Sequence, residues 1–159
     1  MAEHGAHVYR VSKSFEVESG HMLSKHPSRC RYPHGHTRRI EVVVSSPVLD
    51  ENDMVCDFAA LKHALHEFLD RLDHSLAVNS ADPMLPRLAD VRERVVVFPN
   101  QDPTTEVLAR SIFDFLSDRI ASRRPITDGQ GRSYALPPTL CVERVRVGET
   151  SSTWAEYGV

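Results

Sequence analysis

The chain has 159 residues, of which 41% are hydrophobic and 26% charged, and its formal net charge is −3. This length suits a single domain over residues 1–159 with one hydrophobic core. The lack of a Lys/Arg run argues against a nucleic-acid partner, and no apolar stretch is long enough to span a membrane. Met1–Arg10 lacks the apolar region of a secretory signal, so we expect a cytoplasmic protein.

Two stretches near the N-terminus, at residues 9–17 and 36–44, alternate between apolar and polar side chains. Alternation with a period of two is typical of a strand that is buried on one face. Ser45-Ser46-Pro47 ends the second stretch, because such residues favour turns. The sequence therefore predicts two strands in this region.

Two amphipathic helices follow, separated by a loop-rich segment at residues 80–102. Asp57 can cap the first helix and Thr104 the second, where Pro103 suits the first turn or the residue before it. Within the loop-rich segment, the apolar run Val95–Phe98 fits either a strand or a buried loop.

The C-terminal part contains an exposed excursion at residues 123–138 and then two strands at 140–147 and 152–157. The order β-β-α-α-β-β predicts an α+β fold, in which two helices packed on one face cover an antiparallel sheet. Since the other face of the sheet stays open, we expect oligomerisation to protect that face or the sheet edges.

Histidines at the ends of the first two strands are spaced so that they can share a metal ion. His34 and His36 are two residues apart at the start of the second strand, so their side chains point to the same face. His21 follows the first strand, and antiparallel pairing would bring it beside them. Three imidazoles and an open coordination position are typical of catalytic zinc. The alternative is a His-Gly-His turn with exposed rings.

Cys30 lies in the loop that enters this corner of the sheet, and Arg29 and Arg31 flank it. Neighbouring cations favour the thiolate form of a cysteine, which can act as a base or a nucleophile. Two alternatives are a fourth zinc ligand, which would make the site structural, and an inert thiol. Cys56 and Cys141 have apolar neighbours and are expected in the core.

Asp73 and His74 directly follow the first helix. A carboxylate beside an imidazole can fix its tautomer and increase its basicity, which suits a proton relay. The alternative is that the histidine only stabilises the C-terminus of the helix.

Several short motifs occur in a fixed order almost from end to end. They are Phe15-x-Val17-x-Ser19-x-His21, Cys30-x-x-x-His34-Gly35-His36, Met54-Val55-Cys56-Asp57-Phe58, Leu72-Asp73-His74, Pro103-Thr104-Thr105-Glu106 and Glu149-Thr150. In these motifs the chain resembles the 6-pyruvoyltetrahydropterin synthase / 6-carboxytetrahydropterin synthase family, which has the tunnelling fold.

The resemblance implies an enzyme whose cofactor is Zn²⁺, with the metal ligands His21, His34 and His36. It assigns the catalytic thiol to Cys30 and the proton relay to Asp73 with His74. Glu149 would bind the pterin, because a carboxylate can accept two hydrogen bonds from the ring edge. Thr105 and Glu106 would help to line that pocket, and their alternative role is to cap and stabilise the first turn of the second helix.

The family assembles as hexamers made of two stacked trimers, with active sites between subunits. The three residues between Cys30 and His34 resemble the bacterial carboxy-synthase type. The implied reaction converts 7,8-dihydroneopterin triphosphate to 6-carboxy-5,6,7,8-tetrahydropterin and serves the queuosine-type 7-deazapurine pathway. The alternatives are 6-pyruvoyltetrahydropterin synthase, a dihydroneopterin aldolase-type lyase, and a non-catalytic zinc- or pterin-binding homologue.

The chain also departs from the family pattern. Ser19-Gly20 stands where the family usually has Ala-Ala, Asp53 replaces a common Gly, and Thr37-Arg38 follows His36 in place of an Asn-aromatic pair. The segments 80–102 and 123–138 are longer than in compact carboxy-synthases. These departures concern the shape of the substrate pocket rather than the metal ligands.

Overall fold

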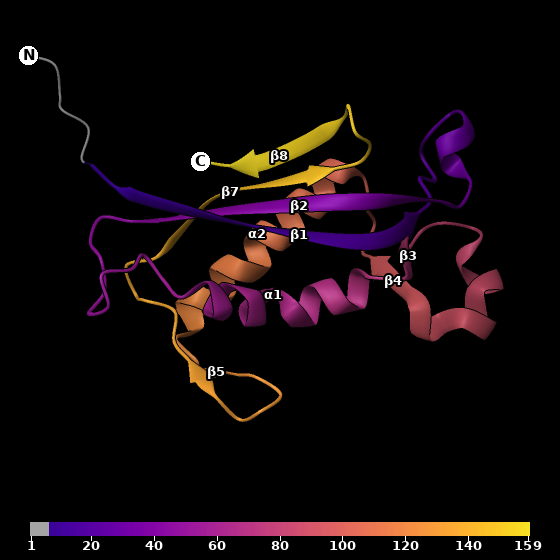
Figure 1. The fold of residues 1–159 in the computed structure, drawn as a ribbon. Coiled ribbons are helices and arrows are strands. Elements are labelled where there is room, and N and C mark those ends of the chain that lie inside the picture. The colour runs from indigo at the N-terminus through magenta and orange to yellow at the C-terminus, as the bar shows by residue number, and fades with distance from the viewer. Residues whose placement is uncertain (1–6) are drawn as a thin grey trace, which may run out of the picture.

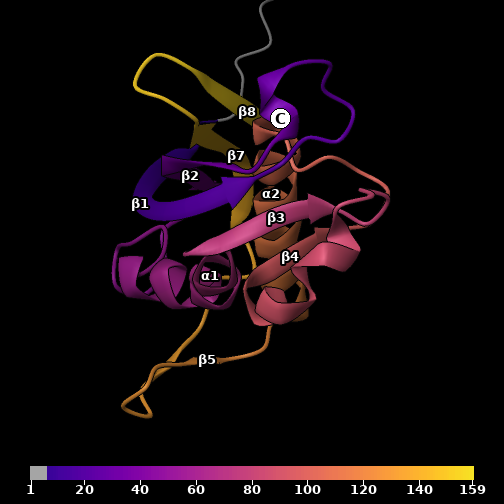
Figure 2. The same cartoon turned by 90° about the vertical axis from the view of Figure 1, so that its right-hand side faces the viewer.

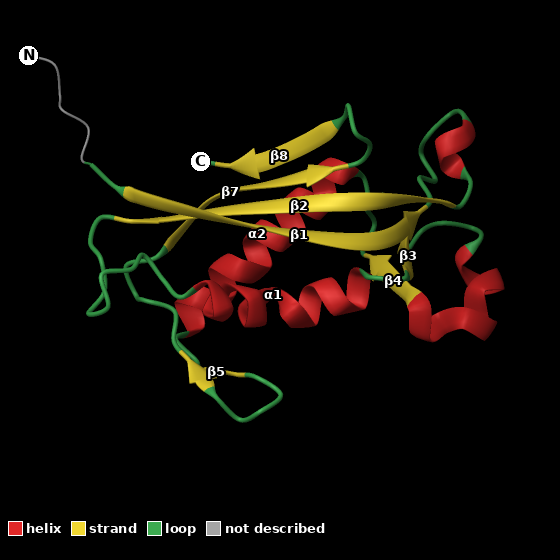
Figure 3. Cartoon of the chain, in the orientation of Figure 1, coloured by secondary structure: helices red, strands yellow, loops and turns green. Residues whose placement is uncertain are grey.

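The computed structural model describes residues 7–159 and contains a six-stranded sheet, a small hairpin and two α-helices (Figures 1 and 3). Residues 1–6, part of the segment searched for a secretory signal, lie outside the described range. The elements are β1 (Tyr9–His21), β2 (His34–Ser46), α1 (Phe58–Leu72), β3 (Ser75–Asn79), β4 (Val95–Phe98), α2 (Thr105–Ser122), β5 (Ile126–Thr127), β6 (Ser133–Tyr134), β7 (Cys141–Gly148) and β8 (Trp154–Gly158).

The strand order in the sheet is β4-β3-β1-β2-β7-β8. Both helices lie on one side of the sheet, and the view along the strands in Figure 2 shows the sheet curving around them. Helix α1 packs against β1 and β3, whereas α2 packs against β7 and β8. The predicted α+β class, with the helices on one face, is confirmed. Within residues 7–159, neither helix combines the length and apolar character that crossing a bilayer requires.

The predicted strands correspond to β1, β2, β7 and β8, which are neighbours in the sheet and pair antiparallel. The first two are longer than the alternation indicated, with 13 residues each. His21 is therefore the last residue of β1 rather than a residue beyond it, and His34 is the first residue of β2. These two residues are paired across the ladder.

The sheet also contains β3, which the sequence does not predict, and β4, the run Val95–Phe98 whose sequence fits either a strand or a buried loop. These two strands pair parallel, β3 with the end of β1 and β4 with β3, so the complete sheet is mixed. Such short strands give too few residues for a periodic signal. Their stability depends on partners that are distant in sequence.

The predicted helix caps are present in the structure. The Asp57 carboxylate accepts a hydrogen bond from the Ala59 backbone N–H at 2.7 Å. The Thr104 hydroxyl accepts one from the Val107 N–H at 3.3 Å. Each cap satisfies one of the backbone donors that the first turn of a helix leaves without a partner.

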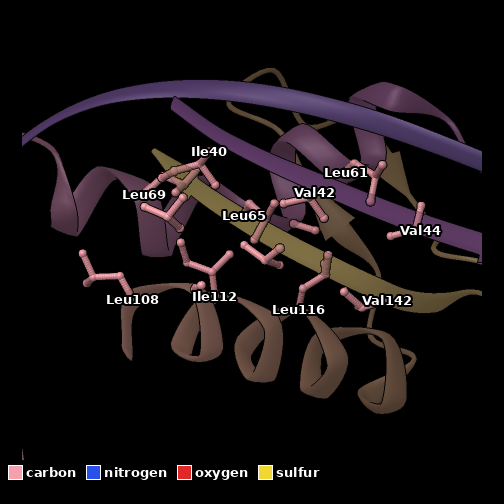
Figure 4. Packing of buried hydrophobic residues seen from close by; sticks show 14 of the residues in the cluster. Ile40, Val42, Val44, Leu61, Leu65, Leu69, Leu108, Ile112, Leu116 and Val142 are labelled. Atoms are coloured by element: carbon pink, nitrogen blue, oxygen red, sulfur yellow. The ribbon is translucent and has the colours of Figure 1, made fainter. Parts of the chain in front are cut away.

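The hydrophobic core lies between the helices and the inward face of the sheet (Figure 4). Both helices contribute an apolar stripe at helical spacing, and β2 contributes alternate residues. The labelled core residues are Leu61, Leu65, Leu69, Leu108, Ile112, Leu116, Ile40, Val42, Val44 and Val142. This packing fixes β1 and β2 in one register and so fixes the end of the sheet where the histidines lie.

Replacement of Leu65 by alanine is expected to lower the free energy of unfolding by about 2–5 kcal/mol. Leu65 is completely buried, so the change removes apolar contacts and leaves a cavity. Urea unfolding of Leu65→Ala and of the exposed control Glu67→Ala would measure the difference. Equal midpoints for the two variants would contradict the packing described above.

The open face of the sheet is polar, as the exposed residues of β1 illustrate: Arg10, Ser12, Ser14, Glu16 and Glu18. At the edge of the sheet, the Trp154 side chain of β8 is exposed and the Arg146 guanidinium carbon lies 4.0 Å from the centre of its ring. Within residues 7–159, β1 pairs with β3 only over Ser19–His21, so most of this side of β1 is also an unpaired edge.

The two remaining cysteines differ in their surroundings. Cys56 is buried as predicted, and burial, reinforced by the negative charges of Asp57 and Asp50, raises its pKa to about 11. The prediction that Cys141 belongs to the core is wrong, because this residue is exposed. Cys141 begins β7, and the alternation of that strand gives the inward position to Val142 instead.

Candidate metal centre

The pairing of β1 with β2 brings the three predicted histidines together. His21 is opposite His34 in the ladder, and His36 is two residues further along on the same face. The ring centres are 4.5 Å apart for His21 and His34, 5.2 Å for His21 and His36, and 5.1 Å for His34 and His36. The alternative of an exposed turn is excluded, because His21 is buried and the other two rings are partly buried.

Backbone carbonyls fix the orientation of two of the rings. The Nδ1–H of His21 donates to the Pro103 carbonyl, and that of His34 donates to the Tyr32 carbonyl, both at 2.8 Å. A neutral imidazole that donates through Nδ1 carries its lone pair on Nε2. A backbone carbonyl that accepts the other ring N–H is a usual partner of a metal-binding histidine.

The Nε2 atoms of His21 and His36 are buried and have no hydrogen-bond partner among residues 7–159. A buried polar atom without a partner is costly, so two of them in one cluster call for an explanation. A metal ion would use both lone pairs, and three imidazoles are a preferred ligand set for Zn²⁺. The residues present therefore fit the metal that the sequence predicted.

Glu149 joins the histidines as the fourth member of the cluster. Candidate ligand atoms of the four residues all lie within 4.8 Å of one another. The Oε1 atom of Glu149 is 3.2 Å from Nε2 of His36 and 3.7 Å from Nε2 of His21. The cluster formed by the described residues thus contains a carboxylate where the structural-zinc alternative required the Cys30 thiol.

The charge states in the cluster also suit a cation. Burial lowers the pKa of His21 to about 4, and the positive charge of Arg38 adds to this effect. Burial and Arg38 lower the pKa of His36 as well. Burial alone would raise the pKa of Glu149, but the hydrogen bond from Thr105 and the nearby positive groups outweigh it, so its pKa is lowered. Neutral imidazoles and an ionised carboxylate are the forms that bind metals.

Arg38 is a further residue of this site, and in the sequence it stands out only as a departure from the family pattern. Its side chain is fully buried, and it donates hydrogen bonds to Ser19 and Thr105. A signal was available in the sequence, because Arg38 has the same strand parity as His34 and His36 and must point to the same face.

The predicted acid–base residues do not belong to the four-residue cluster. Cys30 is partly exposed in the turn Arg29–Arg31. The Nδ1 atom of His74 is 2.8 Å from Asp73 Oδ2, so the predicted pair forms. The His74 side chain is nevertheless 74% exposed.

Asp73 is held in place by the chain around it. Its Oδ1 atom accepts a hydrogen bond from the Glu18 backbone N–H at 2.8 Å. This bond, and the one with His74, lower the pKa of Asp73. His74 lines a shallow pocket of about 350 Å³ that also includes Glu18 and His36.

The two residues predicted to line the pterin pocket occupy different positions. The buried Thr105 hydroxyl donates a hydrogen bond of 2.6 Å to Glu149 Oε2, so Thr105 is part of the site. Glu106 is exposed in the first turn of α2, the position of its alternative role in stabilising the helix N-terminus.

Asp102 connects the metal corner to the loop that carries Cys30. Its Oδ1 accepts hydrogen bonds from the Ser24 hydroxyl at 2.7 Å and from the Asn79 amide at 2.8 Å. Its Oδ2 accepts one from the Lys25 N–H at 2.8 Å. The loop between β1 and β2 is thereby tied to the segment that precedes α2.

Comparisons with known proteins found relatives that match nearly the whole chain. The family model described as 6-pyruvoyl tetrahydropterin synthase matches residues 10–158. A 6-carboxy-5,6,7,8-tetrahydropterin synthase from Aquifex aeolicus is 33% identical over 168 aligned positions, which cover 94% of this chain and 97% of the relative. The enzyme of the same name from Haemophilus influenzae is 26% identical and covers 94% of this chain and 99% of its own length.

Solved structures share the fold. An uncharacterized protein from Wolinella succinogenes superimposes with a TM-score of 0.75 at 22% identity and covers 95% of this chain and 98% of its own. Plasmodium vivax 6-pyruvoyltetrahydropterin synthase gives a TM-score of 0.67 at 16% identity, with coverage of 96% and 99%. Because the family model matches nearly the whole length of this chain, the chain belongs to the 6-pyruvoyl tetrahydropterin synthase family.

Proposed function

We propose that this protein is a zinc-dependent 6-carboxy-5,6,7,8-tetrahydropterin synthase that acts on 7,8-dihydroneopterin triphosphate. One water molecule is consumed, and the products are 6-carboxytetrahydropterin, triphosphate and acetaldehyde. The observation that carries the proposal is the three-histidine cluster, with two buried ring nitrogens that lack hydrogen-bond partners in the described part of the chain. The named relative from Aquifex aeolicus supports this choice of reaction within the family. The enzyme would work in the cytoplasm and supply the queuosine-type 7-deazapurine pathway.

His21, His34 and His36 would hold the metal through Nε2. When bound, Zn²⁺ supplies a Lewis acid that polarises oxygen atoms on the substrate side chain. Glu149 would accept hydrogen bonds from the N–H and amino edge of the pterin. Because Glu149 lies beside the histidines, a pterin bound there would lie against the metal centre.

Cys30 and His74 would move the protons. Asp73 accepts the Nδ1–H of His74, which leaves Nε2 free to take up a proton and return it. Since neither residue belongs to the cluster within one chain, we propose that assembly completes the site. A hexamer of two trimers would cover the unpaired edges of β1 and β8 and place the exposed His74 of one copy against another.

Product identification tests the proposed reaction. The zinc-loaded protein would be incubated with 7,8-dihydroneopterin triphosphate, and the products would be analysed by mass spectrometry with a separate assay for acetaldehyde. We expect 6-carboxytetrahydropterin and an equal amount of acetaldehyde. A pyruvoyl product without acetaldehyde would instead identify a 6-pyruvoyltetrahydropterin synthase. An unchanged substrate would favour a non-catalytic zinc- or pterin-binding protein.

A further inference from the structure

Arg38 is a fully buried charged side chain directly behind the metal centre, with 0% exposure. A buried cation is costly unless its donors are hydrogen-bonded and its charge is compensated. The proposed reaction does not by itself assign a role to this residue. Its contacts show where its charge is used.

The guanidinium connects two strands and a helix through hydroxyl groups. Its Nε–H donates to Ser19 Oγ at 3.0 Å, and NH1 donates to Thr105 Oγ1 at 3.1 Å. Thr105 in turn donates to Glu149 Oε2 at 2.6 Å. A continuous chain of hydrogen bonds therefore runs from Ser19 through Arg38 and Thr105 to the carboxylate in the cluster.

The direction of these bonds is determined by chemistry. A guanidinium can only donate, so the Thr105 oxygen must act as the acceptor toward Arg38. The single hydroxyl hydrogen of Thr105 is then directed to Glu149 Oε2. This arrangement holds one carboxylate oxygen in place and leaves Oε1 facing His21 and His36.

A second contact of Arg38 limits how it can act. Its NH2 group is 3.2 Å from His21 Nδ1, whose hydrogen already points to the Pro103 carbonyl at 2.8 Å. Two donors cannot form a hydrogen bond with each other, so this contact does not orient the imidazole. Arg38 therefore acts on Glu149, while the carbonyl orients His21.

We propose that Arg38 is a positioning residue that, with Ser19 as its acceptor, orients Glu149 for pterin binding. The inference rests on the proposed function, because it takes a reduced pterin as the ligand of Glu149. It also explains why two departures from the family pattern occur together, since Ser19 and Arg38 contact each other.

The test compares Arg38→Met with the matched control Arg39→Met. Methionine keeps a long side chain but has no donors, and Arg39 is exposed on the opposite face of the same strand. Fluorescence titration with 7,8-dihydroneopterin would give the pterin Kd of the zinc-loaded proteins. Competition with a chromophoric chelator would give the zinc Kd, and steady-state kinetics would give KM and kcat.

We expect Arg38→Met to raise the pterin Kd and the KM roughly tenfold, with kcat and the zinc Kd changed less than about threefold. Arg39→Met should match the wild type. Ser19→Ala removes one acceptor without emptying the buried site, so it should give a smaller change of about threefold in pterin Kd. This variant decides the question if Arg38→Met fails to fold.

The outcomes separate the two proposals. The wild type could bind zinc and dihydroneopterin while both Arg38→Met and Ser19→Ala bind the pterin as tightly as the wild type does. In that case the positioning role is wrong and the proposed function stands. If zinc affinity falls as much as pterin affinity, Arg38 supports the metal ligands instead, and the positioning role is again wrong. If the wild type does not bind dihydroneopterin, the proposed function fails together with the role of Arg38.

Discussion

Replacement of His34 by alanine is expected to weaken zinc binding by more than about 100-fold. Loss of a supporting partner of a ligand already costs 10- to 100-fold in metal affinity, and loss of the ligand itself must cost more. His34 is the best choice among the three histidines because it is partly exposed, whereas His21 is fully buried. The fold should therefore tolerate the change, and the free energy of unfolding of the metal-free protein should be nearly unaltered.

The measurement is a chelator competition titration on His34→Ala, on the wild type and on His66→Ala. His66 is exposed on α1 and belongs to no part of the cluster, so this variant should bind zinc like the wild type. Equal zinc affinity for His34→Ala and the wild type would show that the metal does not use this imidazole. Equal losses for His34→Ala and His66→Ala would indicate nonspecific binding by surface histidines.

Replacement of Cys30 by alanine should lower turnover by about 100- to 10,000-fold, the range typical of a lost general base or acid. The zinc content of this variant should equal that of the wild type, because the fourth member of the cluster is Glu149 and not a thiol. The combination of lost activity and retained metal distinguishes a catalytic cysteine from a ligand.

Cys141→Ala provides the matched control for this experiment. Cys141 is an exposed free thiol at the start of β7, outside the cluster, so its loss should leave both kcat and zinc content unchanged. A Cys30→Ala protein that loses zinc would support the structural-site alternative. A variant with normal kcat would show that Cys30 is an inert thiol.

The parts of the fold that the sequence predicted are those with a strong periodic signal. Strands β1 and β2 alternate over residues 9–17 and 36–44, and the helices combine a cap with an apolar stripe. The meeting of His21 with His34 follows from antiparallel pairing of those two strands. Local patterns were sufficient here because the interacting residues are close in sequence.

Features that depend on distant partners were not predicted. Strand β3 is stabilised by parallel pairing with residues at the far end of β1. It has only five residues, which are too few to show a periodic pattern that would predict a strand. Position in β7, rather than apolar neighbours, determines that Cys141 is exposed. The link from Arg38 to Thr105 spans 67 residues, so no local pattern contains it. The roles of Cys30, Asp73 and His74 remain predictions.

X-ray absorption spectroscopy at the zinc edge tests the central claim most directly. The wild-type protein, loaded with one equivalent of zinc, should show nitrogen and oxygen neighbours at about 2.0–2.1 Å, with the multiple-scattering pattern of three imidazoles. His34→Ala should lose one imidazole contribution. A sulfur neighbour at about 2.3 Å, or a spectrum unchanged in His34→Ala, would contradict a centre built on His21, His34 and His36.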